Sequence, residues 1–147
     1  MTQYIDTVDH PTLPADVAVE VYRSLEQSKN KKVFAGTDYA WMDPTPALEH
    51  WLNTNISDKL TWGVQYLANK IDAHVDEYVP GGIKLYYLLD VGSNNVHTYW
   101  HDKEGNSIYQ HCLQAHKWYR MRVDVMHSVD NITNGQARVG IGGFFKV

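Results

Sequence analysis

The sequence predicts a mainly β protein, a barrel or sandwich of short strands preceded by two helices. After residue 59, apolar or alternating segments of strand length recur, separated by turn sequences rich in Gly, Asn and Asp. The clearest strand covers residues 83–90 and lies between Pro80-Gly81-Gly82 and a turn at residues 92–95. Before residue 59, apolar side chains recur at helical spacing, so we expect helices there.

The N-terminal segment is expected to support the sheets from outside. Residues 2–6 are compatible with a short strand. A helix is then expected from Asp16 to about residue 28, and its apolar face consists of Val17, Val21 and Leu25. A second helix is expected from near Pro46 to about residue 56, and its apolar stripe consists of Leu48, Trp51 and Leu52.

The C-terminal two thirds are expected to form the β core. Residues 59–68 fit a strand or a helix end, and further strands are expected at residues 96–100, 107–112 and 118–125 and on both sides of Asn134-Gly135. A chain of 147 residues favours one domain. We therefore expect a single domain over residues 1–147, with a helical buttress at 1–58 and the β core at 59–147.

Composition and charge exclude several classes of function. The net charge of −4 gives no electrostatic reason to bind nucleic acid or an anionic membrane. No apolar run is long enough to span a bilayer, and the first residues have no secretory-signal pattern. The single cysteine, Cys112, cannot form an internal disulfide, and it is expected to be a small buried side chain. A cytoplasmic location is the expectation.

His74 and Asp76 are the first candidates for chemistry. On an extended segment, side chains two residues apart point the same way, so an imidazole and a carboxylate are presented together. His127 is the best candidate for a third ligand. Two His and one carboxylate on one face of a metal, with the other positions open, suit a non-haem Fe(II) that activates O₂.

The Asn134-Gly135 turn predicts where a fourth residue lies. A two-residue hairpin there would pair His127 with Gly142 and Asn131 with Arg138. His127 and Arg138 would then project on one face about 13 Å apart along the strands. Gly140 and Gly142 would leave that face open. Arg138 could bind the far carboxylate of a 2-oxo acid whose other end occupies the metal.

These residues resemble the pattern of the 2-oxoglutarate and Fe(II)-dependent oxygenases, especially the short versions found in marine phages and bacteria. The pattern here is His74-Val75-Asp76, a long interval, His127, and Arg138 shortly after it. Many members carry a Ser two residues after the Arg, and this chain has Gly140 there. The resemblance covers about residues 60–145.

The resemblance implies a double-stranded β-helix (jelly-roll, cupin-like) and a dioxygenase that hydroxylates an unactivated C–H. It implies Fe(II) held by His74, Asp76 and His127, with the co-substrate 2-oxoglutarate anchored by Arg138. The substrate, a small molecule or a protein side chain, is not given by the sequence. A phage-encoded member would act in the host cytoplasm.

Two other functions remain open. A non-catalytic jelly-roll module, for binding or as part of a phage structure, could retain the metal site. A cupin-like metalloenzyme could use the metal without a 2-oxo acid. His97 and His101 are expected at surface strand positions. Alternation places one of Tyr86 and Tyr87 toward the interior without indicating which. The sequence also leaves assembly into an oligomer open.

Overall fold

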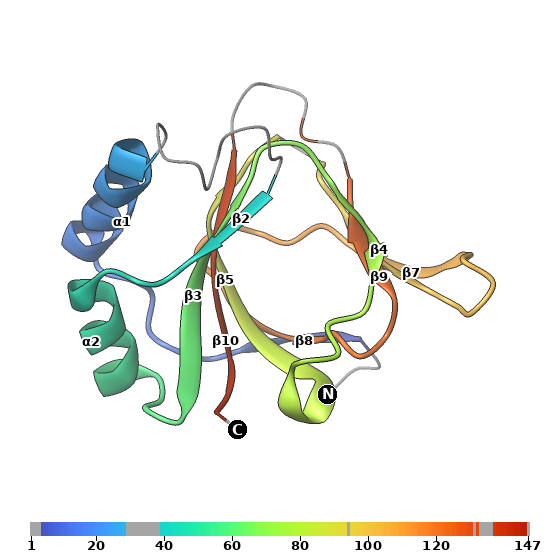
Figure 1. Cartoon of the computed structure of the whole chain (residues 1–147), viewed down its shortest axis with the longest axis horizontal. Coiled ribbons are helices and arrows are strands. Elements are labelled where there is room, and N and C mark those ends of the chain that lie inside the picture. The colour runs from blue at the N-terminus through green and yellow to red at the C-terminus, as the bar shows by residue number, and fades with distance from the viewer. Residues whose placement is uncertain (1–3, 29–38, 94, 131, 133–136, 147) are drawn as a thin grey trace.

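The structure is a computed structural model that describes residues 4–28, 39–93, 95–130, 132 and 137–146. Its strands form two antiparallel sheets (Figure 1). The six-stranded sheet has the order β1-β8-β5-β10-β3-β2, and the four-stranded sheet has the order β4-β9-β6-β7.

The six-stranded sheet consists of β1 (Ile5–Val8), β2 (Tyr39–Met42), β3 (Leu60–Leu67), β5 (Ile83–Val91), β8 (Trp118–Arg122) and β10 (Arg138–Phe145). The four-stranded sheet consists of β4 (Ile71–His74), β6 (Thr98–His101), β7 (Ser107–His111) and β9 (His127–Val129). The helices are α1 (Ala15–Ser28), α2 (Pro46–Asn55) and the short 3₁₀ helix η1 (Pro80–Gly82).

The segment before residue 59 contains both expected helices and also supplies two strands. β1 pairs with β8, and β2 pairs with β3, at the two edges of the six-stranded sheet. The sequence analysis did not predict a strand at residues 39–42. These four residues form a short segment without alternation, and the pairing with β3 identifies them as a strand.

The predicted pairing across Asn134-Gly135 is wrong. The turn itself lies outside the described residues, but the flanking strands do not pair with each other. His127 of β9 is opposite His74 of β4, while Gly142 of β10 is opposite Gly63 of β3. A local turn signal does not specify which sheet each flanking strand joins, and here β9 and β10 belong to different sheets.

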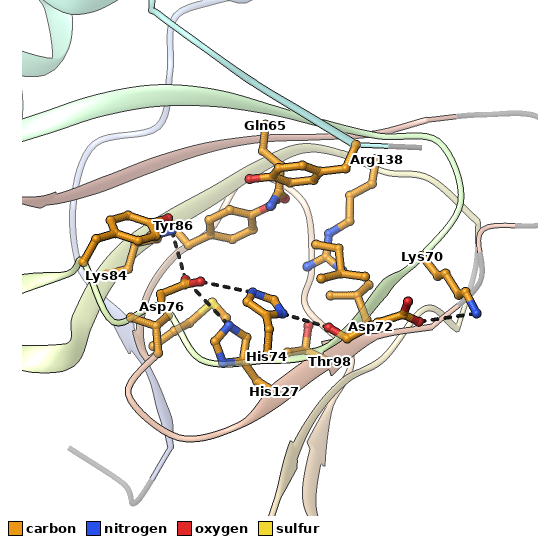
Figure 2. Close-up of a pocket in the computed structure, with 16 residues that line it drawn as sticks. Gln65, Lys70, Asp72, His74, Asp76, Lys84, Tyr86, Thr98, His127 and Arg138 are labelled. Carbon is orange, nitrogen blue, oxygen red and sulfur yellow. Dashed lines mark hydrogen bonds and ion pairs between the residues drawn. The ribbon is translucent and has the colours of Figure 1, made fainter. Parts of the chain in front are cut away.

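The inner face of the six-stranded sheet looks toward the four-stranded sheet and borders a pocket (Figure 2). Alternation along β5 places Lys84 and Tyr86 on this face, whereas Tyr87 packs in the core on the other face. Of the neighbours Tyr86 and Tyr87, Tyr86 is therefore the one that lines the pocket. Arg138 at the start of β10 lines the same pocket.

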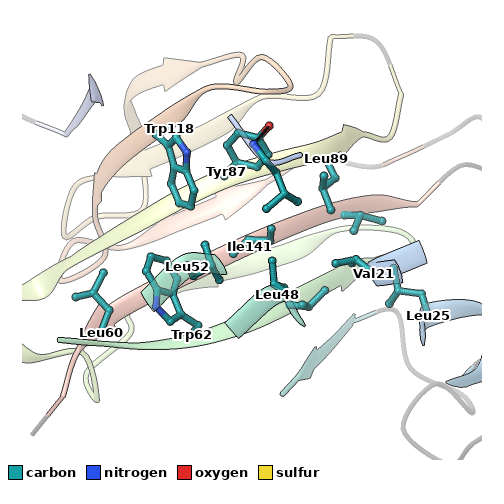
Figure 3. Close-up of a cluster of buried hydrophobic side chains, with 13 residues drawn as sticks. Val21, Leu25, Leu48, Leu52, Leu60, Trp62, Tyr87, Leu89, Trp118 and Ile141 are labelled. Carbon is teal, nitrogen blue, oxygen red and sulfur yellow. Dashed lines mark hydrogen bonds between the residues drawn. The ribbon is translucent and has the colours of Figure 1, made fainter. Parts of the chain in front are cut away.

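The outer face of the six-stranded sheet is covered by α1 and α2 (Figures 1 and 3). Val21 and Leu25 of α1 and Leu48 and Leu52 of α2 are buried, as their helical spacing predicts. Thr45 caps α2 by accepting a hydrogen bond from the N–H of Leu48 at 3.3 Å. Within the described segments, no helix is both long and apolar enough to cross a membrane.

Candidate metal centre

Strand pairing brings the two candidate histidines together. His74 is the last residue of β4, His127 is the first residue of β9, and the two are directly opposed in the antiparallel ladder. Directly opposed side chains project on the same face of a sheet. Both imidazoles line the pocket between the sheets, and their ring centroids are 4.4 Å apart.

Asp76 lies just beyond the end of β4 and is held there by its backbone. Its N–H donates to the carbonyl oxygen of Val123 at 2.9 Å. Its Oδ1 lies 3.1 Å from Nε2 of His74, and its Oδ2 lies 3.7 Å from Nε2 of His127. One donor atom from each of the three residues lies within 4.8 Å of the other two. The structure thus brings the three predicted ligands together (Figure 2).

Both histidines are oriented by backbone carbonyls. Nδ1 of His74 lies 2.8 Å from the carbonyl oxygen of Asp72, and Nδ1 of His127 lies 2.7 Å from that of Val125. A carbonyl oxygen only accepts hydrogen bonds, so each Nδ1 must carry a proton. In a neutral imidazole the lone pair is then on Nε2, the atom that faces Asp76. Metal-binding histidines normally make such a hydrogen bond through the ring nitrogen that does not bind the metal.

Asp76 is a buried carboxylate that stays ionised. The residue is 8% exposed, and burial by itself would raise its pKa. The neighbouring imidazoles of His127 and His74 and the charge of Lys84 outweigh burial and hold the pKa of Asp76 well below its usual range. The hydrogen bond with Asp76 raises the pKa of His74, although burial opposes it. Without a cation, Asp76 therefore favours a proton on His74.

Lys84 of β5 contacts the candidate ligand set from the opposite sheet. The residue is 7% exposed, and its Nζ donates to Oδ2 of Asp76 at 3.3 Å. Nζ also lies 3.4 Å from the hydroxyl of Tyr78 and 4.8 Å from the ring centroid of Trp41. The ammonium is therefore enclosed by one carboxylate and aromatic groups.

Arg138 forms another part of the pocket wall, with Tyr86 beside it. Arg138 is 2% exposed, and its Nε has no hydrogen-bond partner in the described part of the chain. The guanidinium carbon lies 5.7 Å from the centroid of the Tyr86 ring. Burial raises the pKa of Tyr86 to about 12, so its hydroxyl keeps its proton and donates to Oε1 of Gln65. Thr98, which also lines the pocket, is fully buried and its hydroxyl has no partner among the described residues.

The pocket has a volume of about 460 Å³, which is within the usual size of small-molecule sites. Its apolar walls come from both sheets. They include Ile71, Met121, Val123 and Val129. Tyr39 and Tyr78 also line the pocket and are exposed, so they mark its mouth. The side chain of His74 is 38% exposed, and that of His127 is 7% exposed. The candidate centre is thus open to solvent on the His74 side.

The glycines of β10 do not leave open space, contrary to the sequence prediction. A Cβ at Gly140 would meet the hydroxyl of Tyr86, and a Cβ at Gly142 would lie 2.8 Å from the Trp41 ring. These glycines therefore make room for two aromatic side chains. A Ser at position 140 would collide with Tyr86.

The structure also describes His97, His101 and Cys112, three residues that the sequence predictions covered. His97 and His101 do not line the pocket; His97 lies 3.8 Å from Asp130, and Nε2 of His101 lies 2.8 Å from the Ser128 hydroxyl. Cys112 is exposed, so the prediction of a buried thiol is wrong. It follows β7, an edge strand whose residues are mostly exposed.

Among the residues that line the pocket, Lys84 and Thr98 were not predicted from the sequence as parts of the site. Lys84 carried a signal that went unused, because it interrupts an otherwise apolar strand and shares a face with Tyr86. A lysine on the buried face of a strand needs a partner of opposite charge. Thr98 carried no signal, since only tertiary packing shows that its hydroxyl is buried without a partner.

Comparisons with known proteins bear on the fold. No protein-family model matches the chain, and no curated protein matches it. Among solved structures, the chain is similar to a variant of the oxalate decarboxylase OxdC of Bacillus subtilis, with a TM-score of 0.50 and 13% identity over 79% of this chain and 28% of that chain. A second variant of that enzyme gives a TM-score of 0.47 and 15% identity over 74% and 25%.

The fold is a jelly-roll of the cupin type. The two antiparallel sheets, the small helical content and the likeness to OxdC agree on this, and the predicted fold class is confirmed. The chain spans about a quarter of the length of the oxalate decarboxylase chains that it matches. At this identity the likeness establishes the fold, and function has to be argued from the site itself.

Proposed function

We propose that this protein is an Fe(II)- and 2-oxoglutarate-dependent dioxygenase that hydroxylates a C–H bond of its substrate. The observation that carries the proposal is the pairing of two features in one pocket. Two imidazoles with Nε2 directed at one carboxylate suit a divalent cation with open positions. In the same pocket, a buried guanidinium whose Nε has no partner among the described residues suits a carboxylate.

His74, Asp76 and His127 would hold the metal. Two neutral nitrogen ligands and one carboxylate, with the other positions open, fit Fe(II). When bound, Fe(II) and the 2-oxo acid supply the activation of O₂. The overall reaction consumes substrate, O₂ and 2-oxoglutarate and yields hydroxylated product, succinate and CO₂.

Arg138 would hold the distal carboxylate of 2-oxoglutarate. Its fork of N–H groups matches a carboxylate and keeps its charge when buried. The ring of Tyr86 packs beside the guanidinium, and the hydrogen bond from Tyr86 to Gln65 fixes that ring. The hydroxyl of Thr98, which has no partner within the described segments, is a further donor on the same pocket wall. These residues would orient the co-substrate, while the substrate would enter at the mouth beside Tyr39 and Tyr78.

Anaerobic titration with Fe(II) and 2-oxoglutarate tests the proposal. We expect the visible metal-to-ligand charge-transfer band of a ferrous 2-oxo acid complex, which needs both components. His127→Ala should abolish the band, and Arg138→Met should shift its appearance to at least about tenfold higher 2-oxoglutarate, since a charge-assisted pair is lost. His97→Ala removes a histidine outside the pocket and is the matched control.

The outcomes separate the competing functions. Fe(II) binding that His127→Ala abolishes, with no band on adding 2-oxoglutarate, would favour a cupin-like metalloenzyme without a 2-oxo acid. Absence of Fe(II) binding in the wild type would favour a non-catalytic module. Release of succinate and ¹⁴CO₂ from labelled 2-oxoglutarate, dependent on Fe(II) and O₂, would support the dioxygenase directly.

A further inference from the structure

Lys84 has no role in the function proposed above, although it contacts a candidate metal ligand. We propose that Lys84 is a positioning residue that holds one carboxylate oxygen of Asp76, so that Asp76 offers a divalent cation a single oxygen. The inference rests on the part of the proposed function in which the triad binds a cation. It does not depend on 2-oxoglutarate or O₂.

The contact between Lys84 and Asp76 is shielded from water. Nζ of Lys84 lies 3.3 Å from Oδ2 of Asp76, and the two side chains are 9% and 10% exposed. The other oxygen, Oδ1, lies nearest Nε2 of His74, at 3.1 Å. Oδ2 also lies 3.7 Å from Nε2 of His127. The two oxygens of one carboxylate therefore differ in their surroundings, because Oδ1 is nearest an imidazole and Oδ2 is nearest the ammonium.

The position of the ammonium is built by its surroundings. Nζ lies 4.8 Å from the ring centroid of Trp41, 5.6 Å from that of Tyr78 and 5.9 Å from that of Phe144. A Cβ at Gly142 would lie 3.5 Å from Cδ of Lys84 and closer still to Trp41. The glycine thus leaves room for both the lysine stem and the indole. Lys84 is held at its stem and at its head, so it stays beside Asp76.

A fixed ammonium changes how Asp76 can bind a metal. A free carboxylate can bind a cation through one or both oxygens. Hydrogen bonding of Oδ2 to Lys84 makes two-oxygen binding compete with a buried charge-assisted hydrogen bond. One-oxygen binding keeps a further coordination position open, which a site that must admit small molecules requires. The nearby positive charge also weakens the binding of a bare divalent cation.

Mn(II) alone is the probe, because it reports both affinity and bound water without O₂ chemistry. Binding is followed by electron paramagnetic resonance, and metal-bound water by proton relaxation. Lys84→Met is compared with the wild type and with Lys70→Met. Lys70 lines the same pocket, but its side chain is half exposed and pairs with Asp72 at 3.4 Å, away from the ligand atoms.

We expect Lys84→Met to bind Mn(II) about tenfold more tightly, because a competing and repelling charge is removed. The number of waters on Mn(II) should fall by about one, since the freed oxygen occupies a position. Lys70→Met should match the wild type within about twofold in affinity, as surface pairs contribute little. Lys84→Arg keeps the charge and should retain the wild-type number of bound waters.

These measurements distinguish a failure of this inference from a failure of the proposed function. A wild type that binds no Mn(II) overturns both this inference and the proposed function. Normal Mn(II) binding with unchanged affinity and hydration in Lys84→Met overturns this inference alone. If Lys84→Met does not fold, the infrared carboxylate bands of the Mn(II)-loaded wild type decide. A wide separation of the two stretches supports a one-oxygen ligand, and a narrow one overturns it.

Discussion

At the scale of single residues, the candidate centre depends on hydrogen bonds that the ligands make outside it. In both histidines the acceptor is the backbone carbonyl two residues earlier, of Asp72 and of Val125. The same local geometry thus sets the same tautomer twice. Asp76 is held in the same manner, with its backbone N–H on Val123 and its carboxylate on Lys84. The three candidate ligands are thus oriented without a cation, which would reduce the entropy lost on binding one.

Metal affinity should fall as the pH is lowered. The pKa of His74 is raised above its usual value of about 6.5, so a proton begins to compete with the cation above that pH. The stability of the cation-free protein depends on pH in the opposite direction. The protonated His74–Asp76 pair stabilises the fold below the unfolded pKa of His, and this stabilisation is lost as the pH rises through the raised pKa. Mn(II) titrations between pH 5.5 and 8 check this, and a pH-independent affinity would contradict it.

Adding a side chain at position 140 should destabilise the protein. Because a Cβ there meets the hydroxyl of Tyr86, we expect Gly140→Ser to lower the free energy of unfolding by about 1–3 kcal/mol. Removing that hydroxyl in Tyr86→Phe should recover part of the loss, which a double-mutant cycle in urea would measure. Additive effects of the two substitutions would show that Tyr86 is not the cause.

At the scale of elements, the two faces of the six-stranded sheet have different tasks. The outer face packs against α1 and α2 and forms a dry core, while the inner face contributes Lys84, Tyr86 and Arg138 to the pocket (Figures 2 and 3). The four-stranded sheet contributes both histidines through the β4–β9 pair. Because side chains alternate along each strand, the same strands contribute to the core on one face and to the pocket on the other.

A cavity in the outer core should lower stability without changing the metal site. Leu52 of α2 is fully buried, so Leu52→Ala should lower the free energy of unfolding by about 2–5 kcal/mol. Val19→Ala alters an exposed side chain of α1 and should change it by less than about 0.5 kcal/mol. Urea unfolding measures both. Mn(II) affinity of folded Leu52→Ala should equal that of the wild type, and a large loss would show that the two faces are coupled.

At the scale of the whole molecule, the centre joins segments that are distant in the chain. His74 and His127 belong to one sheet, Lys84 and Arg138 belong to the other, and Asp76 lies in the loop after β4. A cation bound by the triad would therefore connect β4, β9 and this loop. Anything that binds only the folded state stabilises it by mass action.

Mn(II) should raise the thermal stability of the protein. At a free concentration of about one hundred times Kd, the gain is about 2.7 kcal/mol. For a chain of this size, that gain raises Tm by roughly 5–10 °C. His127→Ala should remove the shift and His97→Ala should keep it, as measured by differential scanning calorimetry. An equal shift in His127→Ala would place the cation elsewhere on the molecule.

The sequence predicted individual helices and strands better than it predicted which strands pair. The spacing of Val17, Val21 and Leu25 identified α1, because it reflects which side of one helix is buried. The apolar segment at residues 83–90, bounded by turn sequences, identified β5. The pairing assumed across Asn134-Gly135 was wrong. Even so, His127 and Arg138 line one pocket, since β9 and β10 belong to opposing sheets. Lys84 and Thr98 were missed because their importance depends on neighbours far away in the sequence.

By itself, the sequence determined the mainly β class and the two helices. These follow from the periodicity of side chains, which depends on contacts within a few residues. Only the tertiary structure decided that His127 stands opposite His74, that Lys84 reaches Asp76, and that aromatic rings fill the space beside Gly140 and Gly142. Those contacts depend on which strands share a sheet, and that choice is made by burial of the whole chain rather than by any local turn.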